Sequence, residues 1–205
     1  YVQNVDHCNT HSPFNPALAP VRQSNLCLEI SLPTKPLSDI NDENGEIALC
    51  TLSAVNLGAI EDLSELADLA DLLVRALDAL LDYQDYPVKA AYHATMRRRA
   101  LGVGVINYAY YLAKNKVRYS DDSALALTHR TFEALQYHLL RASNQLAREL
   151  GTCTGFDETT YAQGILPIDT YKKDMDGICT EPLRCDWESL RADILAHGLR
   201  NSTLT

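Results

Sequence analysis

Several features are scarce or missing in this sequence, and each omission excludes a class of protein. It has no run of 18 apolar residues, so no segment is predicted to span a membrane as a helix. The start, Tyr1–Asp6, does not read as a secretory signal. The six cysteines are widely spaced and include no Cys-x-x-Cys pair, which argues against a disulfide-stapled scaffold. We therefore expect a protein of the reducing cytoplasm, whose important thiols are either reactive or buried.

Positive charge is also limited. Lys and Arg total 18 against 27 Asp and Glu, which gives a net charge of -9. The only cationic run is Arg97-Arg98-Arg99, which is too short for a nucleic-acid-binding tract. We expect neither a nucleic-acid partner nor an anionic membrane partner. A local pocket can still bind a phosphorylated small substrate despite the net charge.

The hydrophobic pattern predicts one domain of α/β class over residues 1–205, because no repeat, low-complexity stretch or shift of composition marks a second domain. Extended segments are expected at Leu26–Leu32, Ile47–Leu57, Leu101–Ile106 and Leu199–Thr205, the second of them as a buried strand. Helices are expected over about 62–82, 89–100, 108–114, 121–150 with Ser120 as cap, and 187–197 with Asp186 as cap. The leucine stripe of the first helix favours packing on a mainly parallel sheet over a coiled coil.

The segment Asn25-Leu26-Cys27-Leu28-Glu29 has the clearest chemical content. In an extended backbone, alternate side chains share a face, so an amide, a thiol and a carboxylate would converge within about 7 Å. A carboxylate can act as a general base, an amide can orient a hydroxyl, and a thiol can donate a hydrogen atom. The plainer interpretation is a solvent-facing Asn and Glu beside a buried Cys, and the five-residue pattern alone favours it.

The surroundings of this segment change that balance. The chain resembles the large subunits of class I ribonucleotide reductases, most closely the aerobic enterobacterial type, over essentially all 205 residues. The segments that carry the resemblance are Pro20–Ile30, Asn41–Ser53, Asn56–Gly58, Leu101–Asn107 and Gly198–Thr203. The first two are highly specific together, and the others support them.

The resemblance implies a fold and a set of residue roles. The chain would be a partial segment of a ten-stranded α/β barrel, with a central finger loop at about 20–35 and the second half-barrel beginning at about 47. Cys27 would carry a transient thiyl radical that takes the 3′ hydrogen of the ribose, and Glu29 would be the general base on the 3′ hydroxyl. Asn25 would hydrogen-bond and orient the ribose. Cys50 would be one of two thiols that reduce the 2′ carbon, and its partner would lie outside this chain.

The resemblance also implies a reaction and its partners. The reaction is reduction of ribonucleoside diphosphates to 2′-deoxyribonucleoside diphosphates for DNA precursor synthesis, by an oxidoreductase with a disulfide as acceptor. A separate small β subunit would supply a diiron–tyrosyl radical or a similar metal–radical centre, and thioredoxin or glutaredoxin would act as reductant. The full large subunit would be a homodimer with ATP and dNTP effector sites outside this segment. The segment itself would bind no metal or cofactor, and we expect no turnover from it alone.

Three alternatives remain open. A small metal or redox module could use His7, Cys8 and His11, although the single Cys-x-x-His pair is a weak zinc signal and structural hydrogen bonding near the loop is the commoner role. The helical region 62–150 could be a noncatalytic interaction module. A cobalamin-dependent reductase shares the Asn-x-Cys-x-Glu pattern, but the strand context of Cys50 favours the class with a separate radical-generating subunit.

Overall fold

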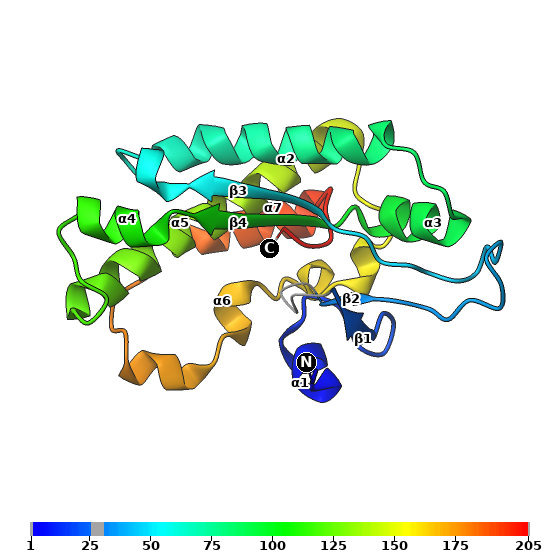
Figure 1. Ribbon diagram of the computed structural model, residues 1–205, viewed down its shortest axis with the longest axis horizontal. Helices are drawn as coiled ribbons and strands as arrows, with labels where there is room; N and C mark the ends of the chain where they lie inside the picture. The colour runs from blue at the N-terminus through cyan, green and yellow to red at the C-terminus, as the bar shows by residue number, and fades with distance from the viewer. Residues whose placement is uncertain (1, 26–30, 205) are drawn as a thin grey trace.

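A computed structural model describes residues 2–25 and 31–204 of the chain, which fold into two small β-sheets and a layered set of helices (Figure 1). The strands are β1 Val21–Ser24, β2 Ser31–Pro33, β3 Thr51–Asn56 and β4 Leu101–Ile106. The α-helices are α1 Val5–His11, α2 Glu65–Tyr83, α3 Lys89–Arg98, α4 Tyr108–Lys114, α5 Asp122–Leu150, α6 Pro167–Thr170 and α7 Trp187–His197. Short 3₁₀ turns lie at η1 Leu57–Ala59, η2 Phe156–Glu158, η3 Thr160–Gln163 and η4 Lys173–Gly177.

Strands β3 and β4 pair in parallel, and α2 and α3 form the crossover between them. This arrangement confirms the prediction of an α/β segment with parallel pairing. The chain's final stretch lies on the other side of β4, where the N–H groups of Leu101 and Val103 donate to the carbonyls of Thr203 (3.0 Å) and Leu204 (3.2 Å). Its backbone bends at 200–202 instead of forming the regular extended element predicted there.

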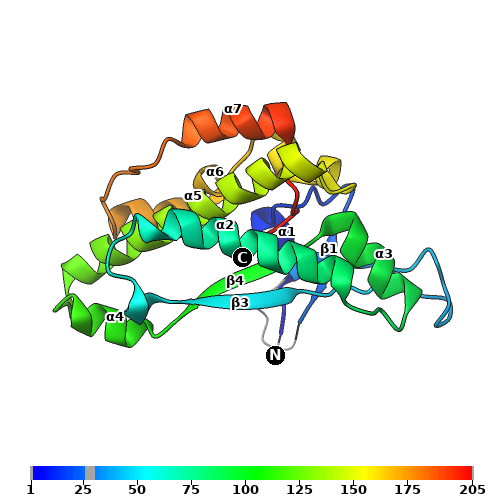
Figure 2. The same cartoon turned by 90° about the horizontal axis from the view of Figure 1, so that it is seen from above.

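Helix α2 forms the centre of the core. Its residues Leu66, Ala70 and Leu77 are buried, whereas Leu80, at the edge of this stripe, is 47% exposed. The buried stripe contacts β3, β4 and α5, and α7 packs on the far side of α5 (Figure 2). The prediction that the leucine stripe belongs to a helix-on-sheet core is confirmed.

The helix ends follow simple capping chemistry. Asp186 caps α7 as predicted, since its Oδ1 accepts a hydrogen bond from the Ser189 N–H (3.0 Å). Gly151 and Gly198 end α5 and α7 with positive φ angles of 83° and 71°, which glycine adopts readily. The prediction of Ser120 as the α5 cap was wrong. Asp121 holds the position before this helix, and its carboxylate accepts from the Arg118 N–H instead.

The strand predicted over Ile47–Leu57 is shorter than expected. It begins at Thr51, and the Ile47 N–H donates to the carbonyl of Ala90 in α3. Leu52 is 59% exposed, so the strand is not buried on both faces among the described residues. β4 is six residues long and pairs one to one with Thr51–Asn56, which leaves residues 47–50 without a neighbouring strand in the described part of the chain.

The antiparallel hairpin of β1 and β2 lies below the β3–β4 pair in Figure 1, beside α1. Ser24 and Ser31 form its last described pair before the loop. A second, smaller core supports the base of the hairpin; it consists of Phe14, Ala19, Val21, Leu32 and Ala100. No helix among residues 2–25 and 31–204 has the length and apolar character needed to cross a bilayer.

Candidate functional site

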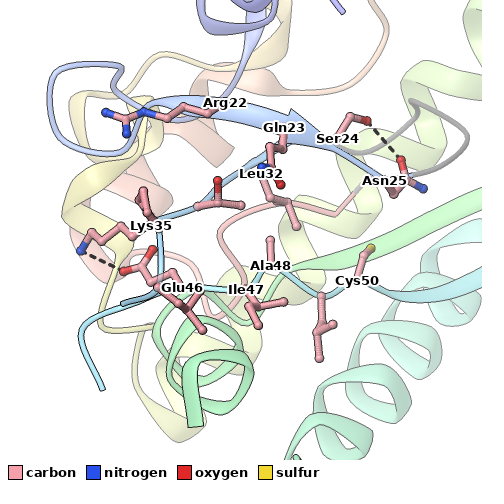
Figure 3. Close-up of a pocket in the computed structure, with 14 residues that line it drawn as sticks. Arg22, Gln23, Ser24, Asn25, Leu32, Lys35, Glu46, Ile47, Ala48 and Cys50 are labelled. Atoms are coloured by element: carbon pink, nitrogen blue, oxygen red, sulfur yellow. Dashed lines mark hydrogen bonds and ion pairs between the residues drawn. The ribbon is translucent and has the colours of Figure 1, made fainter. Parts of the chain in front are cut away.

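A pocket with a volume of about 370 Å³ lies between the hairpin and the segment that leads into β3 (Figure 3). Three stretches of chain line it: the hairpin, the turn after β2, and residues 46–50. The lining residues are Arg22, Gln23, Ser24, Asn25, Leu32, Thr34, Lys35, Pro36, Leu37, Glu46, Ile47, Ala48, Leu49 and Cys50. The pocket therefore brings together regions that the sequence analysis considered separately.

Two of the four predicted site residues can be placed, and both line this pocket. Asn25 directly follows β1, and its Oδ1 accepts a hydrogen bond from the Ser24 hydroxyl (3.2 Å). Cys50 directly precedes β3; it is half-buried and packs against the small core under the hairpin. Its Sγ lies 3.9 Å from the Thr51 carbonyl oxygen. An amide and a thiol thus reach one pocket from different parts of the chain (Figure 3).

Cys27 and Glu29 lie outside the described residues. The predicted common face of Asn25, Cys27 and Glu29 therefore stays a prediction. Asn25 is the last described residue before this loop, and Ser31 is the first one after it.

The sequence analysis missed a buried ion pair at the wall of the pocket. The Glu46 carboxylate receives hydrogen bonds from Arg98 Nη1 (2.6 Å) and from Lys35 Nζ (3.0 Å). The Glu46 and Arg98 side chains are 7% and 3% exposed. Burial acts to raise the pKa of Glu46, but the hydrogen bonds from Arg98 and Lys35 outweigh it and lower the pKa below the usual 4.5. Glu46 is therefore a carboxylate at neutral pH.

The arginine run at the end of α3 is a set of ion pairs. Arg97 pairs with Glu158, and Arg99 pairs with Asp78 on α2. Successive helix residues point about 100° apart, so three arginines in a row cannot all face solvent on one side. This angular spacing was the signal in the sequence that at least one of the arginines faces the interior. The carboxylate partners are too distant in sequence to be identified from it.

The cluster at α1 does not favour a metal site. Gln3 donates a hydrogen bond to Cys8 Sγ (3.4 Å), and the Ser31 hydroxyl lies 3.8 Å from the same sulfur. The rings of His7 and His11 contact each other in a tilted arrangement, with centroids 4.6 Å apart and ring planes at 58°. Across residues 2–25 and 31–204, no group of three or more His, Cys, Asp or Glu side chains is arranged to hold a metal ion. The contacts of Cys8 fit the structural role near the loop.

Comparison with known proteins agrees with the resemblance seen in the sequence. The family model described as "Ribonucleotide reductase, barrel domain" matches residues 1–205. The chain is 76% identical over 205 residues to the ribonucleoside-diphosphate reductase subunit alpha of Haemophilus influenzae. It is 74% identical over 205 residues to the ribonucleoside-diphosphate reductase 1 subunit alpha of Escherichia coli. The subunit alpha of enterobacteria phage T4 is 49% identical over 207 residues. Each match includes 100% of this chain and 27% of the relative, so the chain spans about a quarter of their length. The chain belongs to the ribonucleotide reductase barrel-domain family.

Proposed function

We propose that this chain forms part of the catalytic barrel of a class I ribonucleoside-diphosphate reductase, a ten-stranded α/β barrel with the β1–β2 hairpin as its finger loop. The observation that carries the proposal is the meeting of Asn25 and Cys50 in one pocket. The family resemblance implies that these two residues act in different halves of one reaction. The names of the relatives supply the substrate class, ribonucleoside diphosphates.

The radical half of the reaction is assigned to the hairpin loop. Cys27 is two residues from Asn25, and two residues of chain span at most about 7 Å. A thiyl radical on Cys27 would take the hydrogen from the ribose 3′ carbon and become a thiol. Glu29 would accept the 3′ hydroxyl proton, which helps the 2′ oxygen to leave as water. Asn25 would hold the ribose by a hydrogen bond, and Cys27 would finally return the hydrogen atom to the 3′ carbon.

The reducing half is assigned to Cys50. Loss of the 2′ hydroxyl as water requires two electrons and two protons, and a pair of thiols supplies both when it becomes a disulfide. The net change is therefore one ribonucleotide and two thiols converted to one deoxyribonucleotide, one water and one disulfide. The second thiol would come from a part of the protein outside these 205 residues.

The remaining components follow from the same assignment. A small β subunit, with a diiron–tyrosyl radical or a similar metal–radical centre, would generate the radical, and the full large subunit would act as a homodimer. Thioredoxin or glutaredoxin would regenerate the thiols, and ATP and deoxynucleotides would bind elsewhere as effectors. We place the enzyme in the cytoplasm, where these thiols can be kept reduced.

The deciding experiment measures reduction of a ribonucleoside diphosphate by the full-length large subunit that contains this segment, with its β subunit and a dithiol. Cys27→Ser should abolish product formation because serine cannot form the thiyl radical. Cys179→Ser, which changes a half-buried thiol outside the pocket, is the matched control and should retain activity. Normal turnover by a correctly folded Cys27→Ser variant would contradict the proposal.

A further inference from the structure

A chain of alternating charges begins at the wall of the pocket, where Lys35 and Glu46 line it, and continues into the protein. Lys35 Nζ lies 3.0 Å from Glu46 Oε1, and Glu46 Oε2 lies 2.6 Å from Arg98 Nη1. Arg98 Nη2 then reaches Glu158 Oε2 at 3.4 Å, and Glu158 Oε1 lies 2.6 Å from Arg97 Nη2. Each carboxylate sits between two cations. The central guanidinium, that of Arg98, is 3% exposed.

The backbone around Lys35 and Glu46 joins the hairpin to the segment that carries Cys50. The Lys35 N–H donates to the Glu46 carbonyl (3.2 Å), and the Glu46 N–H donates to the Lys35 carbonyl (3.1 Å). Lys35 is two residues beyond the end of β2, and Glu46 is four residues before Cys50. The Glu46–Arg98 pair therefore fixes this junction to α3.

The other end of the chain of charges reaches the segment that leads into β1. The Asn15 N–H donates to the Glu158 carbonyl (2.7 Å), and the Thr160 N–H donates to the Pro13 carbonyl (2.7 Å). Phe14, between these two contacts, is 1% exposed and belongs to the core beneath the hairpin. Both ends of the hairpin and the segment before Cys50 are thus connected through Arg98.

Stability alone is a weak reason for such an arrangement. The desolvation of two buried charges offsets most of their attraction, so a buried pair is often no better than apolar side chains of the same size. What a pair of this kind adds is a fixed relative orientation of its two side chains, because the planar guanidinium binds carboxylates in a defined geometry. Here the pair orients the junction where the segment after β2 meets the segment before Cys50, and both segments line the pocket.

We propose that Glu46 and Arg98 are positioning residues that set the placement of the β1–β2 hairpin, which carries Asn25, relative to Cys50. This inference rests on the proposed function. Hydrogen transfer and thiol reduction act on neighbouring carbons of one ribose, so the loop and Cys50 must be placed relative to each other within a fraction of an ångström. A loosened junction would still admit substrate, but would slow the reduction and expose the radical to loss.

The test compares the Glu46→Gln and Arg98→Lys variants of the full-length large subunit with wild type, assayed with the β subunit and a dithiol. Glu46→Gln should lower kcat by about ten-fold with KM changed by less than about three-fold. Loss of the β-subunit radical per product formed, followed by electron paramagnetic resonance, should rise several-fold. Arg98→Lys keeps a cation beside Glu46 but loses the planar guanidinium that also reaches Glu158, so it should show both changes in milder form than Glu46→Gln.

A buried ion pair outside the pocket provides the matched control. Asp78 and Arg99 are 2.7 Å apart, and their side chains are 3% and 5% exposed. Asp78 also pairs with Arg200, as Glu46 also pairs with Lys35, so Asp78→Asn removes a carboxylate of similar burial that lies between two cations. This variant should lower the unfolding midpoint as much as Glu46→Gln does, yet keep kcat and radical yield per folded protein. If Glu46→Gln does not fold, Lys35→Met, whose side chain is 53% exposed, should produce the same two changes in milder form.

The outcomes separate the two proposals. Equal kcat and radical yield per folded protein in wild type and Glu46→Gln, or in Lys35→Met when Glu46→Gln does not fold, would overturn the positioning role. The same holds if Asp78→Asn reproduces the loss of radical yield. The proposed function would survive either result as long as Cys27→Ser remains inactive. If Cys27→Ser turns over normally, the reductase assignment itself fails.

Discussion

At the scale of single residues, the thiols of this chain differ by their surroundings. Cys153 is 2% exposed, and burial raises its pKa to about 12. Burial and the Glu133 carboxylate raise the pKa of Cys185 to about 11. Since the thiolate is the reactive form toward electrophiles and disulfides, both should be inert at neutral pH. Cys50, half-buried at the wall of the pocket, is the better placed for redox chemistry.

This difference predicts which thiols a turnover consumes. In the full-length large subunit with its β subunit and no external reductant, one round of product formation should oxidise Cys50 and leave Cys153 and Cys185 reduced. Alkylation after denaturation, read by mass spectrometry before and after the turnover, measures this directly. Cys50→Ser should form no product, and Cys179→Ser should match wild type. A Cys50 thiol still fully alkylated after product has formed would contradict the assignment.

At the scale of elements, long periodic segments were predictable and short irregular ones were not. The helices α2, α5 and α7 follow from their apolar stripes, and each is longer than two turns, so the pattern repeats enough to be read. The start of β3 was misplaced because the apolar run 47–50 precedes the strand, and its residues Ala48 and Cys50 pack against the small core beneath the hairpin. A pattern of apolar residues does not distinguish a strand from an irregular buried segment.

The α2 stripe leads to a prediction of stability. Leu77 is 5% exposed within the main core, so Leu77→Ala should destabilise the structure around α2 by about 2–5 kcal/mol through lost contacts and a cavity. Hydrogen–deuterium exchange of α2 peptides in the full-length subunit should then accelerate by at least about 30-fold. Leu80→Ala, at a position 47% exposed, is the matched control and should change exchange by less than about five-fold. Equal effects of the two substitutions would show that α2 does not face the core as described.

At the scale of the whole molecule, the net charge did not predict which charged side chains are buried or how they pair. The sequence carries nine more acidic than basic charges. Among the described residues, four of the five buried charged side chains nevertheless form the ion pairs Glu46–Arg98 and Asp78–Arg99. Their partners are 52 and 21 residues apart in sequence, so no local pattern could reveal them. The family resemblance, in contrast, proposed Asn25 and Cys50 as site residues, and both line one pocket, because a resemblance draws on a whole folded site instead of local spacing.

The buried Glu46–Arg98 pair makes the free energy of unfolding depend on pH in the acid range. The pKa of Glu46 is lowered in the folded protein from 4.5, so the folded state holds its proton less tightly than the unfolded state. The stabilisation from this carboxylate is therefore complete above about pH 4.5 and is lost as the pH falls through the folded pKa.

Glu46→Gln mimics the protonated form, so its thermal unfolding midpoint should lie below that of wild type at neutral pH. The gap should narrow steadily below about pH 4.5, because wild type then loses the same interaction. Leu77→Ala, whose effect involves no proton, should keep a constant gap from wild type over the same range. Unfolding of the full-length subunit, followed by circular dichroism at a series of pH values, gives both gaps. A Glu46→Gln gap that stays constant into acid would mean that Glu46 is not held as a carboxylate by Arg98 and Lys35.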